Sequence, residues 1–192
     1  MSNKAAIRKT SIPALGLLTW RPMAGYEVKA LIESSLGNFW SESFGQLYPQ
    51  LASLEAEGLI EVDPDAQSDG RGKKVYQITP AGRAHLGNWL EEVPKSRPPR
   101  DELLLKLFFA PEGDLAAIAE HVKVSKTEAS RDLKKYQGIE ADLIARAETN
   151  PKARFWLMTV RNGIQHAQTH LSWCDDVLTE LEQMEGNSDE TL

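Results

Sequence analysis

Apolar residues recur at helical spacing in two separate stretches of the chain, and the first stretch predicts four short helices. The first helix covers Ile12–Leu18 and opens with a proline, which suits an initial helical turn. The second begins at Gly25. The third ends at a stop signal, Gly58, and has one buried stripe formed by Phe44, Leu47, Leu51 and Leu54. The fourth has Thr79 as its cap and Pro80 in its first position.

The hydrophobic period changes after the third helix. Residues 59–62 and 75–78 are short runs rich in β-branched and aromatic side chains, which predicts two strands. Gly70 and Gly72 lie between them and favour a turn. Three cations, Arg71, Lys73 and Lys74, are clustered just before the second strand. The pattern therefore predicts a β-hairpin with a basic tip.

The third helix presents a small, uncharged face opposite its buried stripe, and Pro49 lies on this face. Such a helix followed by a basic-tipped hairpin predicts a winged helix-turn-helix. The helix enters the major groove of DNA, and the wing reaches phosphates or the minor groove. We expect the helix to face bases or nearby phosphates, and the Tyr48 hydroxyl to reach a phosphate. The predicted DNA-binding residues are Ser43, Gln46, Tyr48, Gln50, Ser53, Arg71, Lys73 and Lys74.

Several motifs in this first stretch resemble those of the PadR family of transcriptional regulators. They are the core Leu47-Tyr48-Pro49-x-Leu51, the helix start Gly25-Tyr26-Glu27 and the wing exit Tyr76-x-Ile78-Thr79-x-x-Gly82. Together they cover roughly residues 12–90 and are specific as a set. The resemblance implies a winged-helix domain, a C-terminal helical dimerisation domain, and repression that is relieved by a small molecule or another signal.

Residues 93–100 separate the two stretches and contain three prolines and three cations, which predicts a linker. We therefore expect a winged-helix domain over residues 1–92 and an α-helical domain over residues 101–192. The second domain begins with a helix that is apolar on most sides and is therefore expected to be buried. A long amphipathic helix then runs to about Ala147, and Asn150-Pro151 ends it.

The last helix has the most regular pattern in the chain, an unbroken alternation of three- and four-residue steps over about four heptads. Such a seam packs either inside one monomer or between two subunits. Its length favours an intersubunit role for part of it. The predicted dimerisation residues are Leu157, Val160, Ile164, Ala167, Leu171, Cys174, Leu178 and Leu181.

The composition, with 41% hydrophobic and 26% charged residues among 192, is that of an ordinary soluble protein. No apolar run approaches the length of a membrane span, and there is a single cysteine, so we expect a cytoplasmic protein without membrane contact. The net charge is −6, and residues 1–93 contain 9 Lys or Arg and 11 Asp or Glu. DNA binding is therefore expected to use a local basic edge and to be selective and salt-sensitive.

Motifs of catalysis are absent from the sequence, including phosphate-binding glycine loops, nucleophile elbows and zinc-binding HExxH or CxxC pairs. This absence argues against an enzyme, and no cofactor is expected. His166, His170 and Cys174 share one helical stripe, and neighbouring pairs of them have metal-ligand spacing. The three together span about 12 Å, which is too far for one ion, so no metal site is expected.

Three aromatic residues, Phe155, Trp156 and Trp173, flank the seam of the last helix. Their default role is packing. In a family that senses small and often aromatic compounds, their other role is to line a pocket for an aromatic effector.

The sequence as a whole favours a mainly α, homodimeric transcriptional regulator. Its winged helix-turn-helix has three to four helices and a hairpin wing, and its C-terminal domain is all-α and coiled-coil-like. Two reader helices would dock in successive major grooves of a palindromic operator in double-stranded DNA, and the simplest output is repression, with activation as the other. The alternative is a non-catalytic protein-interaction module that binds a partner protein through the same surfaces. The neutral reader face and the acidic balance favour this alternative.

Overall fold

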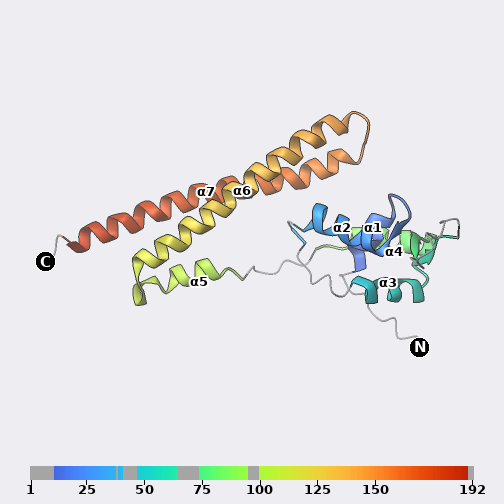
Figure 1. The fold of residues 1–192 in the computed structure, drawn as a ribbon, viewed down its shortest axis with the longest axis horizontal. Helices are drawn as coiled ribbons and strands as arrows, with labels where there is room; N and C mark the ends of the chain where they lie inside the picture. The colour runs from blue at the N-terminus through green and yellow to red at the C-terminus, as the bar shows by residue number, and fades with distance from the viewer. Residues whose placement is uncertain (1–10, 38, 41–46, 65–73, 95–99, 190–192) are drawn as a thin grey trace. The chain divides into compact units, whose positions relative to one another are not determined.

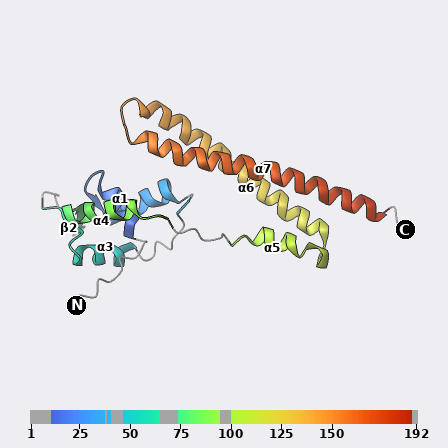
Figure 2. The same ribbon diagram turned by 180° about the vertical axis from the view of Figure 1, so that it is seen from behind.

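The computed structural model describes residues 11–37, 39–40, 47–64, 74–94 and 100–189. The chain divides into two compact units, Met1–Ser96 and Arg97–Leu192, and each is described by itself (Figures 1 and 2). The first unit holds short helices and a small sheet, and the second consists of helices only. The mainly α fold class predicted from the sequence is confirmed. None of the described helices is both long and apolar enough to cross a membrane.

The first half of the first unit contains two short helices. Helix α1 (Ile12–Leu18) has a proline in its first turn, as the sequence predicts. A two-residue strand, β1 (Met23–Ala24), leads directly into α2 (Gly25–Leu31). The chain continues from α2 into one π-helical turn (Ile32–Leu36).

The second half contains α3 (Leu47–Ala56), β2 (Ile60–Val62), β3 (Val75–Ile78) and α4 (Pro80–Glu91). The expected third and fourth helices and both hairpin strands are therefore confirmed within the described residues. The stop signal after α3 is confirmed as well, because Gly58 has a φ of 71°, in the left-handed region that favours glycine.

Thr79 joins the end of the hairpin to the start of α4. Its hydroxyl oxygen accepts a hydrogen bond from the Gly82 N–H (3.1 Å), which caps the helix as predicted. The same hydroxyl donates to the carbonyl oxygen of Gly58 at 2.7 Å. One side chain therefore fixes the end of α3, the exit of the wing and the start of α4 relative to one another.

The three strands form one antiparallel sheet in the order β1-β3-β2. Met23 pairs with Tyr76 on one side of β3, and Val62 pairs with Tyr76 on the other side. Because β1 immediately precedes α2, the sheet ties the hairpin to the first two helices. The sequence does not reveal β1, since two residues are too few to show a period of two.

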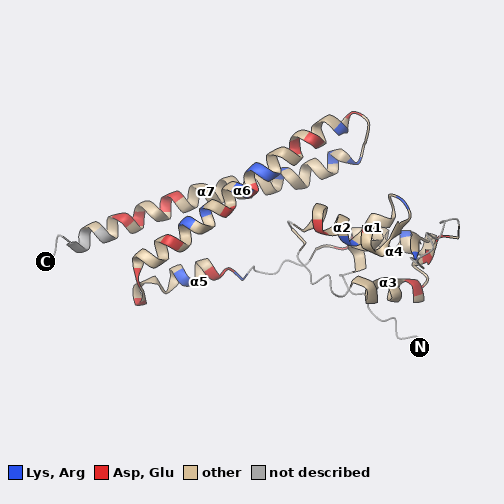
Figure 3. Cartoon of the chain, viewed as in Figure 1, with Lys and Arg blue, Asp and Glu red and all other residues tan. Residues whose placement is uncertain are grey.

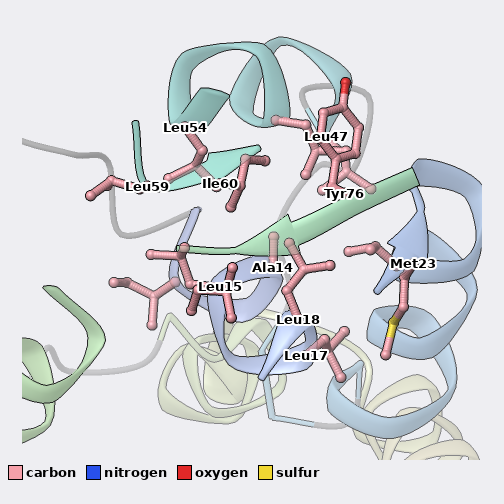
Figure 4. Packing of buried hydrophobic residues seen from close by; sticks show 14 of the residues in the cluster. Ala14, Leu15, Leu17, Leu18, Met23, Leu47, Leu54, Leu59, Ile60 and Tyr76 are labelled. Atoms are coloured by element: carbon pink, nitrogen blue, oxygen red, sulfur yellow. The ribbon is translucent and has the colours of Figure 1, made fainter. Parts of the chain in front are cut away.

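One cluster of buried apolar side chains holds the first unit together (Figure 4). Helix α1 supplies Leu15 and Leu18 from one side of the sheet, and α3 supplies Leu47 and Leu54 from the other, as Figure 4 shows. All four of these leucines are almost completely inaccessible to water. Burial of this kind stabilises the fold by about 2 kcal/mol per side chain and orients α3 firmly.

The second unit is built on two long helices, α6 (Leu115–Ala147) and α7 (Ala153–Asp189). The short helix α5 (Glu102–Phe108) and one 3-10 turn (Ala110–Glu112) precede them. The expected end of the long helix at Ala147 is confirmed. Aspartates cap α5 and α6, because Asp101 accepts from the Leu104 N–H and Asp114 from the Ala116 N–H, each at 3.0 Å.

Helices α6 and α7 run antiparallel and pack along their length within the same chain. At one end Ile118 is buried with Leu181, and at the other Leu143 is buried with Leu157. Between these clusters, Cys174 is completely buried, and burial raises the pKa of its thiol.

The expectation that the first helix of the second unit is buried on most sides is wrong for the single chain. Leu103 and Leu107 are partly buried, but Leu104, Leu105 and Phe108 of α5 are exposed, and so is Phe109 after it. The reason is that α6 and α7 bury their apolar faces against each other, so α5 packs against only one end of the pair.

Candidate nucleic-acid interface

Helix α3 has the two faces expected of a reader helix. Leu47, Leu51 and Leu54 are buried beneath it, as predicted from their spacing. On the outside, Tyr48 is 58% exposed and Ser53 is exposed, whereas Gln50 is half-buried. Of the other residues predicted to bind DNA from this segment, Ser43 and Gln46 lie outside the described residues.

The ring of Tyr48 packs against Gly25, the first residue of α2. A Cβ atom on Gly25 would lie 2.9 Å from Cε1 of Tyr48 and 3.2 Å from Cδ1 of Leu51. A side chain at position 25 would therefore push the Tyr48 ring or Leu51 aside, and glycine lets α2 approach α3 this closely. The contact holds the tyrosine ring against the protein at the N-terminal end of α3 and leaves most of its surface accessible.

The Ser53 hydroxyl is engaged by the residue that directly follows α3. It donates a hydrogen bond to Oε1 of Glu57 at 2.9 Å. Figure 3 shows that acidic residues lie at the C-terminal end of α3, where Glu55 and Glu57 are located. The N-terminal part of the described helix is free of charge, so it is the part best suited to approach DNA.

The wing is described only at its base. Arg71 and Lys73, two of the predicted phosphate contacts, lie outside the described residues. Lys74, the third, is exposed and directly precedes β3. Its Nζ donates to both carboxylate oxygens of Glu55 on α3, at 3.0 Å each. This ion pair joins the base of the wing to the reader helix.

Two groups at this junction, Lys74 and Tyr76, have pKa values that Glu55 helps to raise. The hydrogen bond with Glu55 raises the pKa of Lys74 above its ordinary value of 10.5. Burial raises the pKa of Tyr76, and the negative charge of Glu55 raises it further. Figure 4 shows the Tyr76 ring beside Leu47, with its hydroxyl at the end nearest α3. The carboxylate of Glu55 is therefore the main local source of negative charge for both neighbours.

Glu55 and Gly25 were not singled out as functional residues from the sequence. A signal for Glu55 was present, since it is the only acidic residue between Ser43 and Ala56. Its partner Lys74 is 19 residues away, and no sequence periodicity links residues across that distance.

In the second unit, the predicted dimerisation seam faces α6 of the same chain. Cys174 is completely buried there, and Leu157, Ala167 and Leu181 are nearly so. These four residues pack within the chain, and an intersubunit role for part of the seam stays a prediction. Val160, Ile164, Leu171 and Leu178 are half-buried along the same seam.

The three aromatic residues predicted to line one effector pocket are not brought together. Trp156 packs against the cluster around Leu157, while Phe155 next to it is exposed. Trp173 lies about 26 Å farther along the same helix, at 1.5 Å per residue. The two tryptophans therefore lie far apart within one chain, and a role for these aromatic residues in an effector pocket stays a prediction.

A different hollow, of about 750 Å³, lies on the surface of the second unit. Its lining is basic and contains none of those aromatic residues. The lining residues are Lys123, Lys126, Thr127, Ser130, Arg131, Lys134 and Leu178. Lys126 forms an ion pair with Asp175 of α7.

The two histidines of α7 differ in their surroundings. His170 is hydrogen-bonded to the Ser125 hydroxyl (2.8 Å) and stacks on the Trp173 ring, with centroids 5.2 Å apart. His166 is exposed. Across the described part of the chain, no group of three or more His, Cys, Asp or Glu side chains is arranged to hold a metal ion.

Family models match both units of the chain. Residues 14–88 match the model described as "Transcriptional regulator PadR-like family", and residues 99–182 match "Virulence activator alpha C-term". Two curated relatives are similar over nearly their whole length. The negative transcriptional regulator PadR of Bacillus subtilis is 27% identical over 174 residues, 88% of this chain and 95% of the relative. The probable transcriptional regulator Rv1176c of Mycobacterium tuberculosis is 29% identical over 171 residues, 83% of this chain and 90% of the relative.

Solved structures share this architecture. The Vibrio cholerae virulence activator AphA is 28% identical with a TM-score of 0.73, over 90% of this chain and 99% of that chain. Bacillus subtilis PadR in complex with p-coumaric acid is 25% identical with a TM-score of 0.75, over 91% and 99%. The same protein in complex with operator DNA has a TM-score of 0.78 at 24% identity over 91% and 99%, which shows the fold alone. The two family matches together run from residue 14 to residue 182, and residues 14–88 place the first unit in the PadR-like family of transcriptional regulators.

Proposed function

We propose that this protein is a homodimeric repressor that binds a palindromic operator in double-stranded DNA through two copies of its winged-helix unit. The observation that carries the proposal is the geometry of α3. Its buried leucines anchor it in the core, and its exposed N-terminal part bears Tyr48 and no charge. A helix held in this way can enter a major groove and read bases through hydrogen bonds.

Two units are needed because one winged helix makes few base contacts, and coupling two at fixed spacing multiplies their affinity. The exposed apolar residues of the second unit support a dimer. Leu104, Leu105, Phe108 and Phe109 form a row in and just after α5, with the two phenylalanine rings edge to face at 5.1 Å. Contiguous exposed apolar side chains of this kind often mark a contact with a protein partner. We therefore assign the subunit contact to the α5 surface in place of the seam of α7.

Repression is supported by the curated name of the Bacillus subtilis relative, which is a negative regulator, although the Vibrio cholerae relative is named an activator. The Bacillus protein has also been crystallised with p-coumaric acid, an aromatic carboxylic acid. We propose that a small aromatic molecule likewise releases this repressor from DNA. The relatives come from bacteria, whose DNA lies in the cytoplasm, and we propose the same compartment for this protein.

The proposal is tested by selecting bound sequences from a random DNA library with the full-length protein. The expected result is a palindromic consensus whose half-sites are separated by about one helical turn or a multiple of it. A mobility-shift assay with the gene's own upstream region is expected to show the same site. Recovery of no consensus, together with capture of a partner protein, would favour the protein-interaction module instead.

Base reading by α3 is tested with Gln50→Ala. If Gln50 makes paired hydrogen bonds to an adenine, the variant lowers operator affinity by roughly 1–3 kcal/mol and leaves random-DNA affinity nearly unchanged. Gln137→Ala, at an exposed position of α6, is the matched control and is expected to bind as the wild type does. Equal losses on operator and random DNA would contradict a base-reading role for Gln50.

A further inference from the structure

The ion pair between Glu55 and Lys74 is a charged link between α3 and the residue that precedes β3, the strand that leaves the wing. The Lys74 ammonium lies 3.0 Å from both oxygens of Glu55, and the two residues are 19 positions apart in sequence. The lysine side chain is 56% exposed and that of the glutamate 31%. The pair is therefore accessible to a phosphate that approaches from solvent.

An exposed ion pair of this kind is weak, because water and salt screen it. A DNA phosphate can compete with Glu55 for the lysine. When it does, the carboxylate stays beside the phosphate and repels it. This cost is the same for every DNA sequence, because phosphates carry no sequence information.

We propose that Glu55 is a specificity-determining residue that acts through Lys74. It weakens sequence-independent DNA binding, and it ties the base of the wing to the reader helix. The inference rests on the DNA-binding function proposed above and adds a role for an acidic residue within the reader element. The first unit as a whole carries a small net negative charge, and Glu55 places one of its negative charges at the base of the wing. This repulsion lowers the affinity for every DNA sequence alike, so the ratio of operator to random affinity depends on the positioning role of the pair.

The positioning role follows from which elements the pair joins. Glu55 is the last residue but one of α3, and Lys74 is the first described residue after the wing loop. On an operator, the wing and α3 must reach their contacts at the same time. A wing that is tied to α3 reaches its phosphates with less loss of conformational freedom. Random DNA gains less from this tie, because it offers α3 no matching bases.

The test is Glu55→Gln in the full-length protein, with affinities for operator and random duplexes measured from 50 to 400 mM salt. The substitution keeps the size of the side chain but removes the charge. If it releases one cation for phosphate contact, the log–log salt slope for random DNA steepens by about 0.9. Random-DNA affinity then rises about eightfold at 0.1 M salt. Operator affinity rises less, because the tie between wing and helix is lost, so the ratio of operator to random affinity falls.

Two further variants separate this mechanism from a general effect of charge. Glu33→Gln also removes one negative charge and releases one lysine, because Glu33 pairs with Lys29 at 3.8 Å on a different element. It is expected to leave the salt slope unchanged. In the Lys74→Gln background, Glu55→Gln is expected to lose most of its effect on random DNA. An undiminished effect in that background would show that Glu55 does not act through Lys74.

The outcomes also distinguish this inference from the proposed function. A wild-type protein that selects no DNA sequence would overturn the proposed function itself. A wild-type protein that binds its operator, with a Glu55→Gln variant whose random-DNA affinity and salt slope equal those of the wild type, overturns only the role of Glu55. Thermal melting of each variant shows whether it is folded. A fall in both affinities with an unchanged slope would also overturn the inference, because it indicates a purely structural residue.

Discussion

Gly82 is placed where α4 crosses the start of β2, and the space there admits no side chain. A Cβ atom on Gly82 would lie 2.1 Å from the Leu59 carbonyl oxygen and 2.9 Å from Cγ1 of Ile78. The first of these neighbours is backbone and cannot rotate away. This contact sets the distance between α4 and the sheet, and with it the position of the wing exit capped by Thr79.

We expect Gly82→Ala to lower the free energy of unfolding by at least about 2 kcal/mol, because the helix or the sheet must move apart to accept the methyl group. Urea denaturation followed by circular dichroism measures the change. Gly87→Ala in the same helix is the control, since a Cβ there meets no atom within 4 Å. That control is expected to raise stability by about 0.5–1 kcal/mol, because alanine favours helix. Equal effects of the two substitutions would contradict the packing argument.

At the scale of elements, α2 depends on a carboxylate at its start. The Glu27 side chain accepts a hydrogen bond from the Ala24 N–H at 2.8 Å and another from the Arg21 guanidinium at 2.8 Å. These two bonds, the backbone one first, hold the pKa of Glu27 below its ordinary value of 4.5. The cap positions α2, whose first residue Gly25 supports the Tyr48 ring.

Because the pKa of Glu27 is lower in the folded state than in the unfolded state, its carboxylate stabilises the fold fully above pH 4.5. That contribution is lost as the pH falls through the lowered folded value. We expect Glu27→Gln to reduce the free energy of unfolding by about 1 kcal/mol at pH 7. The difference from the wild type should shrink steadily below pH 4.5. Urea titrations at several pH values measure it, and a difference that is independent of pH would show that the charge plays no part.

At the scale of the whole molecule, the regular seam of α7 packs against α6. The apolar α5 surface, formed by Leu104, Leu105, Phe108 and Phe109, stays exposed. Phe108 is 78% exposed, whereas Cys174 in the seam is completely buried. The two positions therefore report on different contacts. One belongs to the surface that we assign to the partner subunit, and the other to the fold of the unit itself.

We expect Phe108→Asp to give a folded monomer with unchanged helix content and greatly weakened operator binding, because an unpaired charge opposes burial in an apolar contact. Light scattering and circular dichroism measure these properties. Cys174→Asp is the contrasting variant and is expected to unfold the second unit, since the seam has no space or partner for a carboxylate. A wild-type protein that is monomeric at micromolar concentration would contradict the dimer.

The sequence by itself determined those features whose causes are local. The leucine period of α3, the left-handed glycine at position 58 and the Thr79 cap each act within a few residues, so the helices and hairpin strands could be predicted. The heptad seam of α7 was also visible, because it is a repeat along one helix.

Only the tertiary structure decided which surfaces those elements meet. The seam of α7 packs against α6 of its own chain, and Glu55 forms an ion pair with Lys74 across the hairpin. Gly25 lies against the Tyr48 ring, and β1 is a strand only because it pairs with β3. In each case the partner is distant in sequence, and the choice depends on packing and on charges brought together by folding. Local periodicity carries no information about such partners.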